Sequence, residues 1–128
     1  QGDCLDPASL GTALRGVETA YYLVHSMGSS QDFESRDREA AENFGRAAWE
    51  QGVSRIVYLG GLTPEHPESA HLRSREETGD VLRAGSVPVT ELRAGMIIGP
   101  GSAAWEVIRD LVNHLPVMVT PRWVRQLT

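Results

Sequence analysis

Short apolar runs alternate along this chain with longer segments in which apolar residues recur every three or four positions. Residues 20–24 and 56–59 are continuous apolar and aromatic runs. Runs of this kind are typical of strands that are covered on both faces in a parallel sheet. A third run begins at residue 87, and further apolar residues extend it to about residue 98. The pattern therefore predicts three strands, each followed by a loop that contains glycine.

The segments between these runs have helical periodicity. Residues 33–51 place apolar side chains on one helical face and charged side chains on the other, and a glycine follows. Similar spacing predicts helices over residues 70–84 and 102–115. A short helix over residues 6–16 begins with Asp and Pro, which favour a helix start, and ends at a glycine. Residues 117–119 are predicted as a short additional strand.

The distances between the predicted strands decide the fold class. The strands begin near residues 20, 56 and 87, so successive starts are 36 and 31 residues apart, and each interval holds a helical pattern. This length suits one strand-helix-strand unit, whose two strands run parallel. The sequence therefore predicts an α/β fold with a parallel sheet, in a single domain over residues 1–128.

The composition of the chain argues against nucleic-acid-binding, membrane-spanning and metal-binding functions. The chain has 17 acidic and 12 basic side chains and a net charge of −5, which disfavours nucleic acid as a partner. Its apolar runs are too short to cross a bilayer, and no basic-then-apolar leader is present, so we expect a cytoplasmic protein without a membrane partner. The single cysteine, Cys4, cannot form an internal disulfide. His66 and His114 are isolated, and no metal site is expected.

Four segments resemble a known superfamily. Ligands of open parallel sheets bind beyond the carboxyl ends of the strands, and these segments include those ends: residues 2–10, 20–28, 55–62 and 87–101. The most specific of them is Leu-Arg-Ala-Gly-Met-Ile-Ile-Gly-Pro-Gly. Together they resemble the atypical and extended short-chain dehydrogenase/reductases. The similarity is greatest to the NAD(P)-binding, nucleoside-diphosphate-sugar-epimerase-like branch, which includes regulators of the nitrogen-metabolite-repression type.

The resemblance implies a nicotinamide dinucleotide, NADP or NAD, as cofactor. Asp3 occupies the position of an acidic residue that holds the adenine amino group in this superfamily. The loop after residue 24 would pass under the ribose and nicotinamide, and the loop after residue 94 would touch the nicotinamide. The implied cofactor contacts are Asp3, Cys4, Val24, His25, Ser26, Gly60, Gly61, Ala94, Gly95, Met96 and Ile97.

Two departures from the superfamily affect function. Relatives begin with a strand, a Gly-x-x-Gly-x-x-Gly turn and a helix that together hold the pyrophosphate, and no glycines of this chain have that spacing. We therefore expect an incomplete Rossmann-like three-layer α/β/α fold, equivalent to the carboxyl-terminal half of the doubly wound domain. The glycine-rich part would be missing, and the dinucleotide affinity would be reduced.

The second departure concerns catalysis. Superfamily reductases use a Tyr-x-x-x-Lys pair, in which the lysine lowers the pKa of the tyrosine so that the phenol can exchange a proton with the substrate. The matching window holds His71 and Arg75 at the same spacing. The superfamily's serine or threonine should lie near Gly61, and Thr63 is the nearest hydroxyl. Candidate catalytic residues are therefore His71, Arg75 and Thr63, although a solvated helix turn is the simpler explanation of the first two.

Three functional hypotheses remain open. The chain could be an NAD(P)-binding protein that is derived from a reductase or epimerase, has degenerate catalytic residues and acts on an unknown small molecule. It could instead be a noncatalytic regulator that senses nucleotide occupancy. The third hypothesis is an interaction module that forms a homo-oligomer through an uncovered sheet edge.

Overall fold

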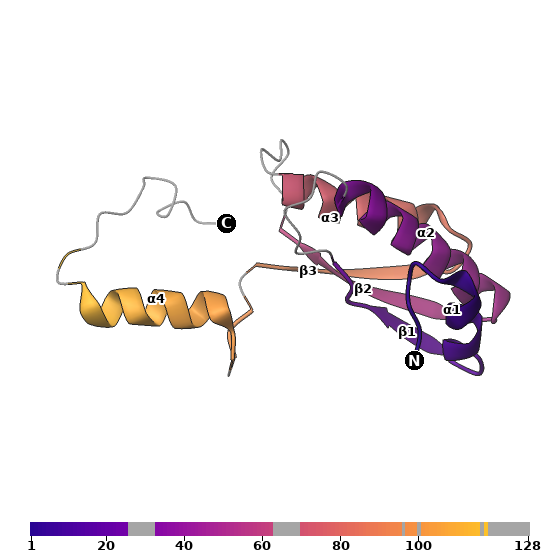
Figure 1. Ribbon diagram of the computed structural model, residues 1–128, viewed down its shortest axis with the longest axis horizontal. Coiled ribbons are helices and arrows are strands. Elements are labelled where there is room, and N and C mark those ends of the chain that lie inside the picture. Colours follow the sequence, from indigo (N-terminus) through magenta and orange to yellow (C-terminus); the bar gives the residue numbers. More distant parts are fainter. Residues whose placement is uncertain (26–32, 63–69, 96, 100, 116, 118–128) are drawn as a thin grey trace. The chain divides into compact units, whose positions relative to one another are not determined.

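Strands and helices alternate along the chain, as the apolar pattern predicts. The computed structural model describes residues 1–25, 33–62, 70–95, 97–99, 101–115 and 117. Its elements are α1 (Pro7–Ala13), β1 (Thr19–Tyr22), α2 (Phe33–Glu50), β2 (Arg55–Gly61), α3 (Ala70–Ala84), β3 (Val89–Ala94) and α4 (Ala103–His114) (Figure 1). The chain divides into two compact units, residues 1–94 and 95–128, which are described separately. A single domain stays a prediction.

The three strands form one parallel sheet in the order β1-β2-β3. Tyr22 pairs with Tyr58, and Gly61 pairs with Ala94. The carboxyl ends of all three strands therefore lie at the same edge of the sheet. This arrangement confirms the predicted fold class, an open parallel sheet with helices that is consistent with part of a Rossmann-like domain.

The predicted strand ends were wrong in two places. β1 ends at Tyr22, two residues earlier than predicted, because its last paired residue is opposite Tyr58. β3 occupies only Val89–Ala94. Pro88 before it has no N–H group to donate to a neighbouring strand, and β2 ends opposite Ala94. Of the predicted strand over residues 117–119, residues 118 and 119 lie outside the described part of the chain.

The helix ends follow the predicted signals closely. The Asp6 side chain accepts a hydrogen bond from the Ala8 amide at 3.1 Å and so caps α1. Gly16 and Gly52 follow the ends of α1 and α2 with φ values of 74° and 73°, a left-handed conformation that glycine adopts without steric cost. These local signals explain why the predicted helices agree well with the observed ones.

The sheet is buried on one face only among the described residues of 1–94. Helices α2 and α3 contact each other and lie along one side of the strands (Figure 1). Side chains alternate accordingly along β1, where Ala20 and Tyr22 are buried and Tyr21 is 66% exposed. No described helix of residues 1–94 lies over the second face of the sheet, so coverage of the strands on both faces stays a prediction.

The core lies between the sheet and the helices. Tyr22 meets Phe44 of α2 edge-on, with ring centroids 4.9 Å apart, and its ring centroid is 6.1 Å from that of Tyr58. The buried cluster comprises Leu10, Leu14, Ala20, Tyr22, Ala41, Phe44, Ala47, Ala48, Val53, Ile56, Tyr58, Leu82 and Val87. Aromatic pairs of this kind add to the stability that burial supplies. The core fixes α2 and α3 relative to the strand ends.

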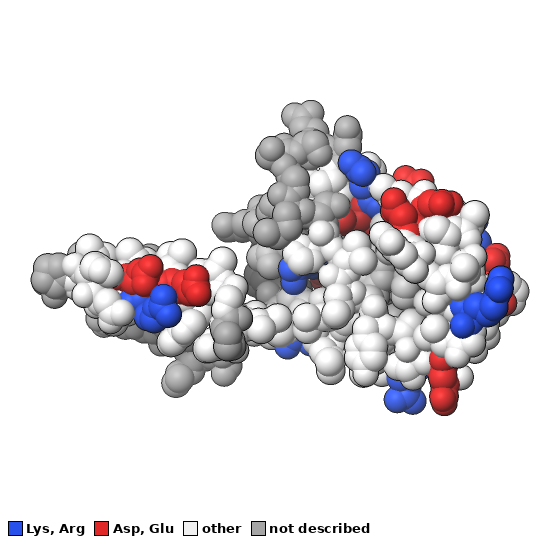
Figure 2. Space-filling model, turned by 60° about the horizontal axis from the view of Figure 1, so that its bottom comes forward, with Lys and Arg blue, Asp and Glu red and all other residues white. Residues whose placement is uncertain are grey.

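Two surface properties bear on possible partners. Within the described part of the chain, no helix has the length and apolar character needed to cross a membrane. On the side of the molecule shown in Figure 2, acidic and basic side chains are interspersed, and neither sign of charge forms a continuous stripe.

Candidate functional site

A hollow of about 400 Å³ lies where the first residues of the chain meet the end of β1 and the first turns of α2. It is lined by Gln1, Gly2, Asp3, Cys4, Leu5, Val24, Arg36, Asp37 and Ala40. Three residues that the sequence proposes as cofactor contacts, Asp3, Cys4 and Val24, thus lie around one space. They come from segments about twenty residues apart in the sequence, which only the fold brings together. We name this space the Asp3 hollow.

Short-range hydrogen bonds fix the backbone around Asp3. Its amide donates to Ser9 Oγ at 2.8 Å, and its carbonyl accepts from the Asp6 amide at 3.0 Å. The carboxylate oxygen Oδ1 accepts from the Leu5 amide at 2.9 Å. The second oxygen, Oδ2, has no hydrogen-bond partner among the described residues. Asp3 therefore presents one available acceptor oxygen on a loop that α1 holds in place.

Cys4 contributes packing and not a reactive group. Its carbonyl accepts a hydrogen bond of 3.1 Å from Nδ2 of Asn43, a buried residue of α2. Burial raises the pKa of the Cys4 thiol, and the negative charge of Asp3 raises it further. A thiol with a raised pKa stays protonated near neutral pH, so it is a poor nucleophile. Cys4 serves to join the loop to α2.

Helix α2 supplies the other wall of the Asp3 hollow, which the sequence analysis did not anticipate. Asp37 is only 8% exposed and accepts a hydrogen bond from Ser74 Oγ of α3 at 2.9 Å. Ala40 is buried one turn later, whereas Arg36 is exposed. A usable signal was present, because a helix that follows a parallel strand begins at the ligand-binding edge of the sheet.

The predicted catalytic window lies near the end of β2. Gly61 is buried there, and a Cβ atom added to it would lie 3.6 Å from Cδ of Arg75. Tyr58 donates its hydroxyl to the carbonyl of Arg75 at 2.8 Å, which fixes α3 against β2. His71 belongs to the first turn of α3, but its side chain and all of Thr63 lie outside the described residues. The catalytic assignment therefore stays a prediction.

Among the described residues of 1–94, the other predicted contacts do not line the Asp3 hollow. His25 is exposed after β1, and Gly60 is buried within β2. Ala94 is the last residue of β3. Gly95 and Ile97 are exposed and belong to the unit of residues 95–128. Ser26 and Met96 lie outside the described part of the chain. These contacts also stay predictions.

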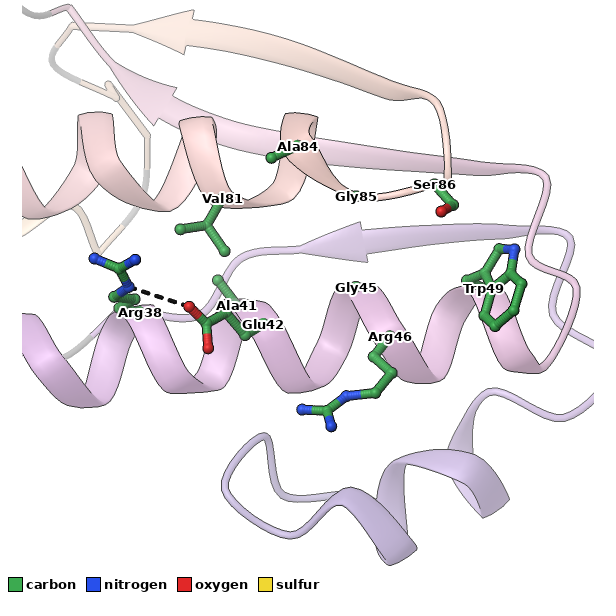
Figure 3. Close-up of a pocket in the computed structure, with 10 residues that line it drawn as sticks. All are labelled: Arg38, Ala41, Glu42, Gly45, Arg46, Trp49, Val81, Ala84, Gly85 and Ser86. Carbon is green, nitrogen blue, oxygen red and sulfur yellow. Dashed lines mark hydrogen bonds and ion pairs between the residues drawn. The ribbon is translucent and has the colours of Figure 1, made fainter.

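A second hollow, of about 440 Å³, lies between α2 and α3 (Figure 3). Val81 of α3 and Ala41 of α2 point toward one another across it. Arg38 and Glu42 are joined on its rim by a hydrogen bond of 3.1 Å, and Trp49, which also lines it, is 61% exposed. None of the described residues that the sequence proposes for the cofactor or for catalysis lines this hollow.

The Asp3 hollow has the size of a small-molecule site and a lining that is partly polar and partly apolar. Its volume of about 400 Å³ is within the usual range for small-molecule sites, roughly 300–1,000 Å³. Asp3 offers an acceptor to an amino group, and Val24 and Ala40 offer apolar surface. No described segment forms a glycine-rich turn, and the described glycines with positive φ, namely Gly16, Gly52 and Gly101, lie far apart in the sequence. The described residues therefore include no glycine-rich turn of the kind that holds a pyrophosphate.

Comparisons with known proteins agree with this geometry at the level of the fold. No protein-family model matches the chain, and no curated protein matches its sequence. Among solved structures, the chain is similar to the triphenylmethane reductase of Citrobacter sp. complexed with NADP(H). The identity is 27%, the TM-score is 0.59, and the match covers 72% of this chain and 31% of the reductase.

Two further structures extend the similarity to sugar-nucleotide enzymes. A nucleoside-diphosphate-sugar epimerase of Staphylococcus aureus is 21% identical, with a TM-score of 0.68, over 88% of this chain and 38% of the epimerase. The dTDP-glucose 4,6-dehydratase of Streptomyces venezuelae with NAD bound is 20% identical, with a TM-score of 0.74, over 89% of this chain and 43% of the dehydratase. The chain is therefore similar in fold to part of these reductase, epimerase and dehydratase structures. It spans less than half of the length of each of these three structures.

Proposed function

We propose that this chain supplies the adenosine-binding part of an NAD(P) site in a Rossmann-type protein with degenerate catalytic residues. The observation that carries the proposal is that Asp3, Cys4 and Val24 converge on one hollow. The resemblance to the superfamily implied these three residues as dinucleotide contacts. The complexes of the similar reductase and dehydratase with NADP(H) and NAD support the same class of ligand.

Asp3 has the central role in this proposal. Its fixed Oδ1 orients the carboxylate, and Oδ2 would accept a hydrogen bond from the adenine amino group. A hydrogen bond to a charged group is worth about 1.5–3 kcal/mol, which is roughly 10- to 100-fold in affinity. Nicotinamide dinucleotides supply hydride transfer when bound. The role of Asp3 is to orient the nucleotide, and it is not a catalytic role.

The test is isothermal titration calorimetry of the 128-residue chain with NAD and with NADP. Asp3→Asn keeps the oxygen that accepts from Leu5 but can replace Oδ2 with an amide donor, and we expect it to weaken binding by about tenfold or more. Glu50→Gln, an exposed change at the far end of α2, is the matched control and should leave the affinity unchanged. Wild-type protein that binds neither dinucleotide would reject the proposal.

A further assay separates an enzyme from a nucleotide-sensing regulator. The window that should hold a Tyr-x-x-x-Lys pair holds His71 and Arg75, which favours binding without rapid turnover. Hydride transfer from NADPH or NADH to quinones and aldehydes, followed by absorbance at the nicotinamide band, measures turnover directly. Binding without any hydride transfer supports the regulator, whereas turnover that is lost in His71→Ala supports the enzyme.

A self-associating interaction module is the second candidate function. The observation in its favour is the exposed face of the sheet, where Tyr21 is 66% exposed and Leu92 is 53% exposed. In addition, β1 and β3 are both edge strands of the described sheet. Exposed apolar faces and unpaired strand edges favour association with other chains. We therefore propose, as the second candidate function, that two copies of this chain associate through this face or these edge strands.

A further inference from the structure

Arg36 supplies the positive charge among the side chains that line the Asp3 hollow. It lies in the first turn of α2, and its side chain is exposed. Arg36 makes no ion pair and no side-chain hydrogen bond within the described structure. A guanidinium on the wall of a hollow that has no partner among the described residues is available to a ligand.

Its neighbour on the same helix shows the contrasting situation. Arg38 donates to Glu42 at 3.1 Å and to Glu77 of α3 at 2.8 Å, so its guanidinium is occupied by two carboxylates. Arg38 lines the other hollow, between α2 and α3 (Figure 3). Arg36 and Arg38 are therefore only two residues apart, but among the described residues only Arg38 is paired with carboxylates. This difference makes Arg38 a matched control for Arg36.

The carboxylates that line the hollow with Arg36 limit which chemical groups of a ligand can bind there. Asp3 and Asp37 both line the Asp3 hollow, where they oppose the one guanidinium. Each is already hydrogen-bonded within the protein, Asp3 to the Leu5 amide and Asp37 to Ser74. A phosphate group placed in this hollow would be repelled by two carboxylates. An uncharged aromatic ring would not be repelled, and a planar guanidinium stacks favourably on such a ring.

We propose that Arg36 stacks on the purine base of the nucleotide, while Asp3 and Asp37 disfavour a phosphate group in the same hollow. This inference rests on the proposed nucleotide site and identifies the part of the ligand that the site selects. Val24 and Ala40, which also line the hollow, would contact the same base through apolar atoms. Arg36 thus acts as a specificity-determining residue and takes no part in hydride transfer.

The experiment compares an uncharged ligand with its phosphorylated form. Adenosine and adenosine monophosphate are titrated calorimetrically into the wild type, Arg36→Ala, Arg36→Lys and Arg38→Ala. We expect Arg36→Ala to weaken both ligands to a similar extent, on the order of tenfold. Lysine keeps the charge but lacks the planar group, so Arg36→Lys should recover only part of the affinity. Arg38→Ala should bind both ligands as the wild type does.

The outcomes separate this inference from the proposed function. If the wild type binds no adenine nucleotide, the proposed function fails and the inference fails with it. If the wild type binds and Arg36→Ala binds equally well, only the inference fails. If Arg36→Ala weakens the monophosphate and leaves adenosine unchanged, the guanidinium pairs with phosphate, and base stacking is rejected. Circular dichroism of each variant checks that an exposed substitution has not altered the fold.

Discussion

The hydrogen bond between Ser74 and Asp37 links α3 to α2 beside the Asp3 hollow. Both residues are buried, and the Oγ–Oδ2 distance is 2.9 Å. Removing the donor leaves a buried carboxylate oxygen without this partner, which costs about 1–3 kcal/mol. We therefore expect Ser74→Ala to lower the free energy of unfolding by that amount in a urea titration. Ser86→Ala, at an exposed serine, is the control and should change it by less than about 0.5 kcal/mol.

Because of Tyr58, we expect the free energy of unfolding to fall at alkaline pH. Burial raises the pKa of its hydroxyl from the ordinary value of 10.0 to about 12. Burial also raises the pKa of Tyr22. The unfolded chain releases these protons near pH 10, whereas the folded chain retains them. The two protonated tyrosines therefore contribute their full stabilisation of the folded state below pH 10. This contribution is lost as the pH rises through their pKa values in the folded chain.

The corresponding prediction is a fall in the free energy of unfolding between pH 10 and pH 12, measured by urea titration at a series of pH values. Tyr58→Phe removes the hydroxyl that donates to the Arg75 carbonyl, so it should be less stable at neutral pH. The free energy of unfolding of Tyr58→Phe should also fall less steeply with pH than that of the wild type, and the fall that remains should come from Tyr22. Identical slopes for the wild type and Tyr58→Phe would contradict this account.

At the scale of the elements, two helix-interior glycines differ in what surrounds them. A Cβ added to Gly45 in α2 would have its nearest contact 4.0 Å away, at Leu82 Cδ2. A Cβ added to Gly79 in α3 would lie 3.2 Å from Cε1 of Tyr58 and 3.1 Å from a guanidinium nitrogen of Arg83. The Arg83 side chain can move, but the Tyr58 ring is buried in the core. The second site is therefore too close-packed for alanine.

We expect opposite effects from the same substitution at these two sites. Gly45→Ala should raise the free energy of unfolding by about 0.5–1 kcal/mol, because alanine loses less backbone entropy in a helix than glycine does. Gly79→Ala should lower it, since the tyrosine ring must shift. Thermal unfolding followed by circular dichroism measures both. The explanation fails if Gly79→Ala is the more stable of the two variants.

At the scale of the whole molecule, we expect the exposed sheet face to decide whether copies of the chain associate at high concentration. Tyr21 and Leu92 are large apolar residues on edge strands and are more than half exposed. We expect the wild type to associate as its concentration rises, because association would cover these side chains. Sedimentation velocity or light scattering over a range of concentrations would measure this.

Lysine substitutions test which surface is responsible. Tyr21→Lys and Leu92→Lys place a charge on the sheet face and should reduce association, with little effect on thermal stability. Trp49→Lys changes an equally exposed side chain at the hollow between α2 and α3 and should leave association unchanged. Loss of association in Trp49→Lys alone would show that the helices, and not the sheet, form the contact.

The sequence determined the local conformation and, through its resemblance to a known superfamily, pointed to three of the residues that line the Asp3 hollow. Its periodicity gave the order of strands and helices, and the lengths between strands gave their parallel direction. Asp3, Cys4 and Val24 could be chosen from the sequence because they belong to short segments that resemble known ones. Helix ends such as Gly16 were also predictable, since the conformation of one residue decides them.

Only the tertiary structure decided which surfaces are covered and which side chains meet. Apolar runs such as residues 20–24 indicate a strand, but they do not show whether a helix lies over one face or both. Strand ends depend on where the neighbouring strand stops, and β3 ends at Ala94 because its partner ends at Gly61. The presence of Arg36 in the wall of the Asp3 hollow was likewise decided by tertiary packing. Its position depends on how α2 packs against distant segments, and a local pattern carries no information about such contacts.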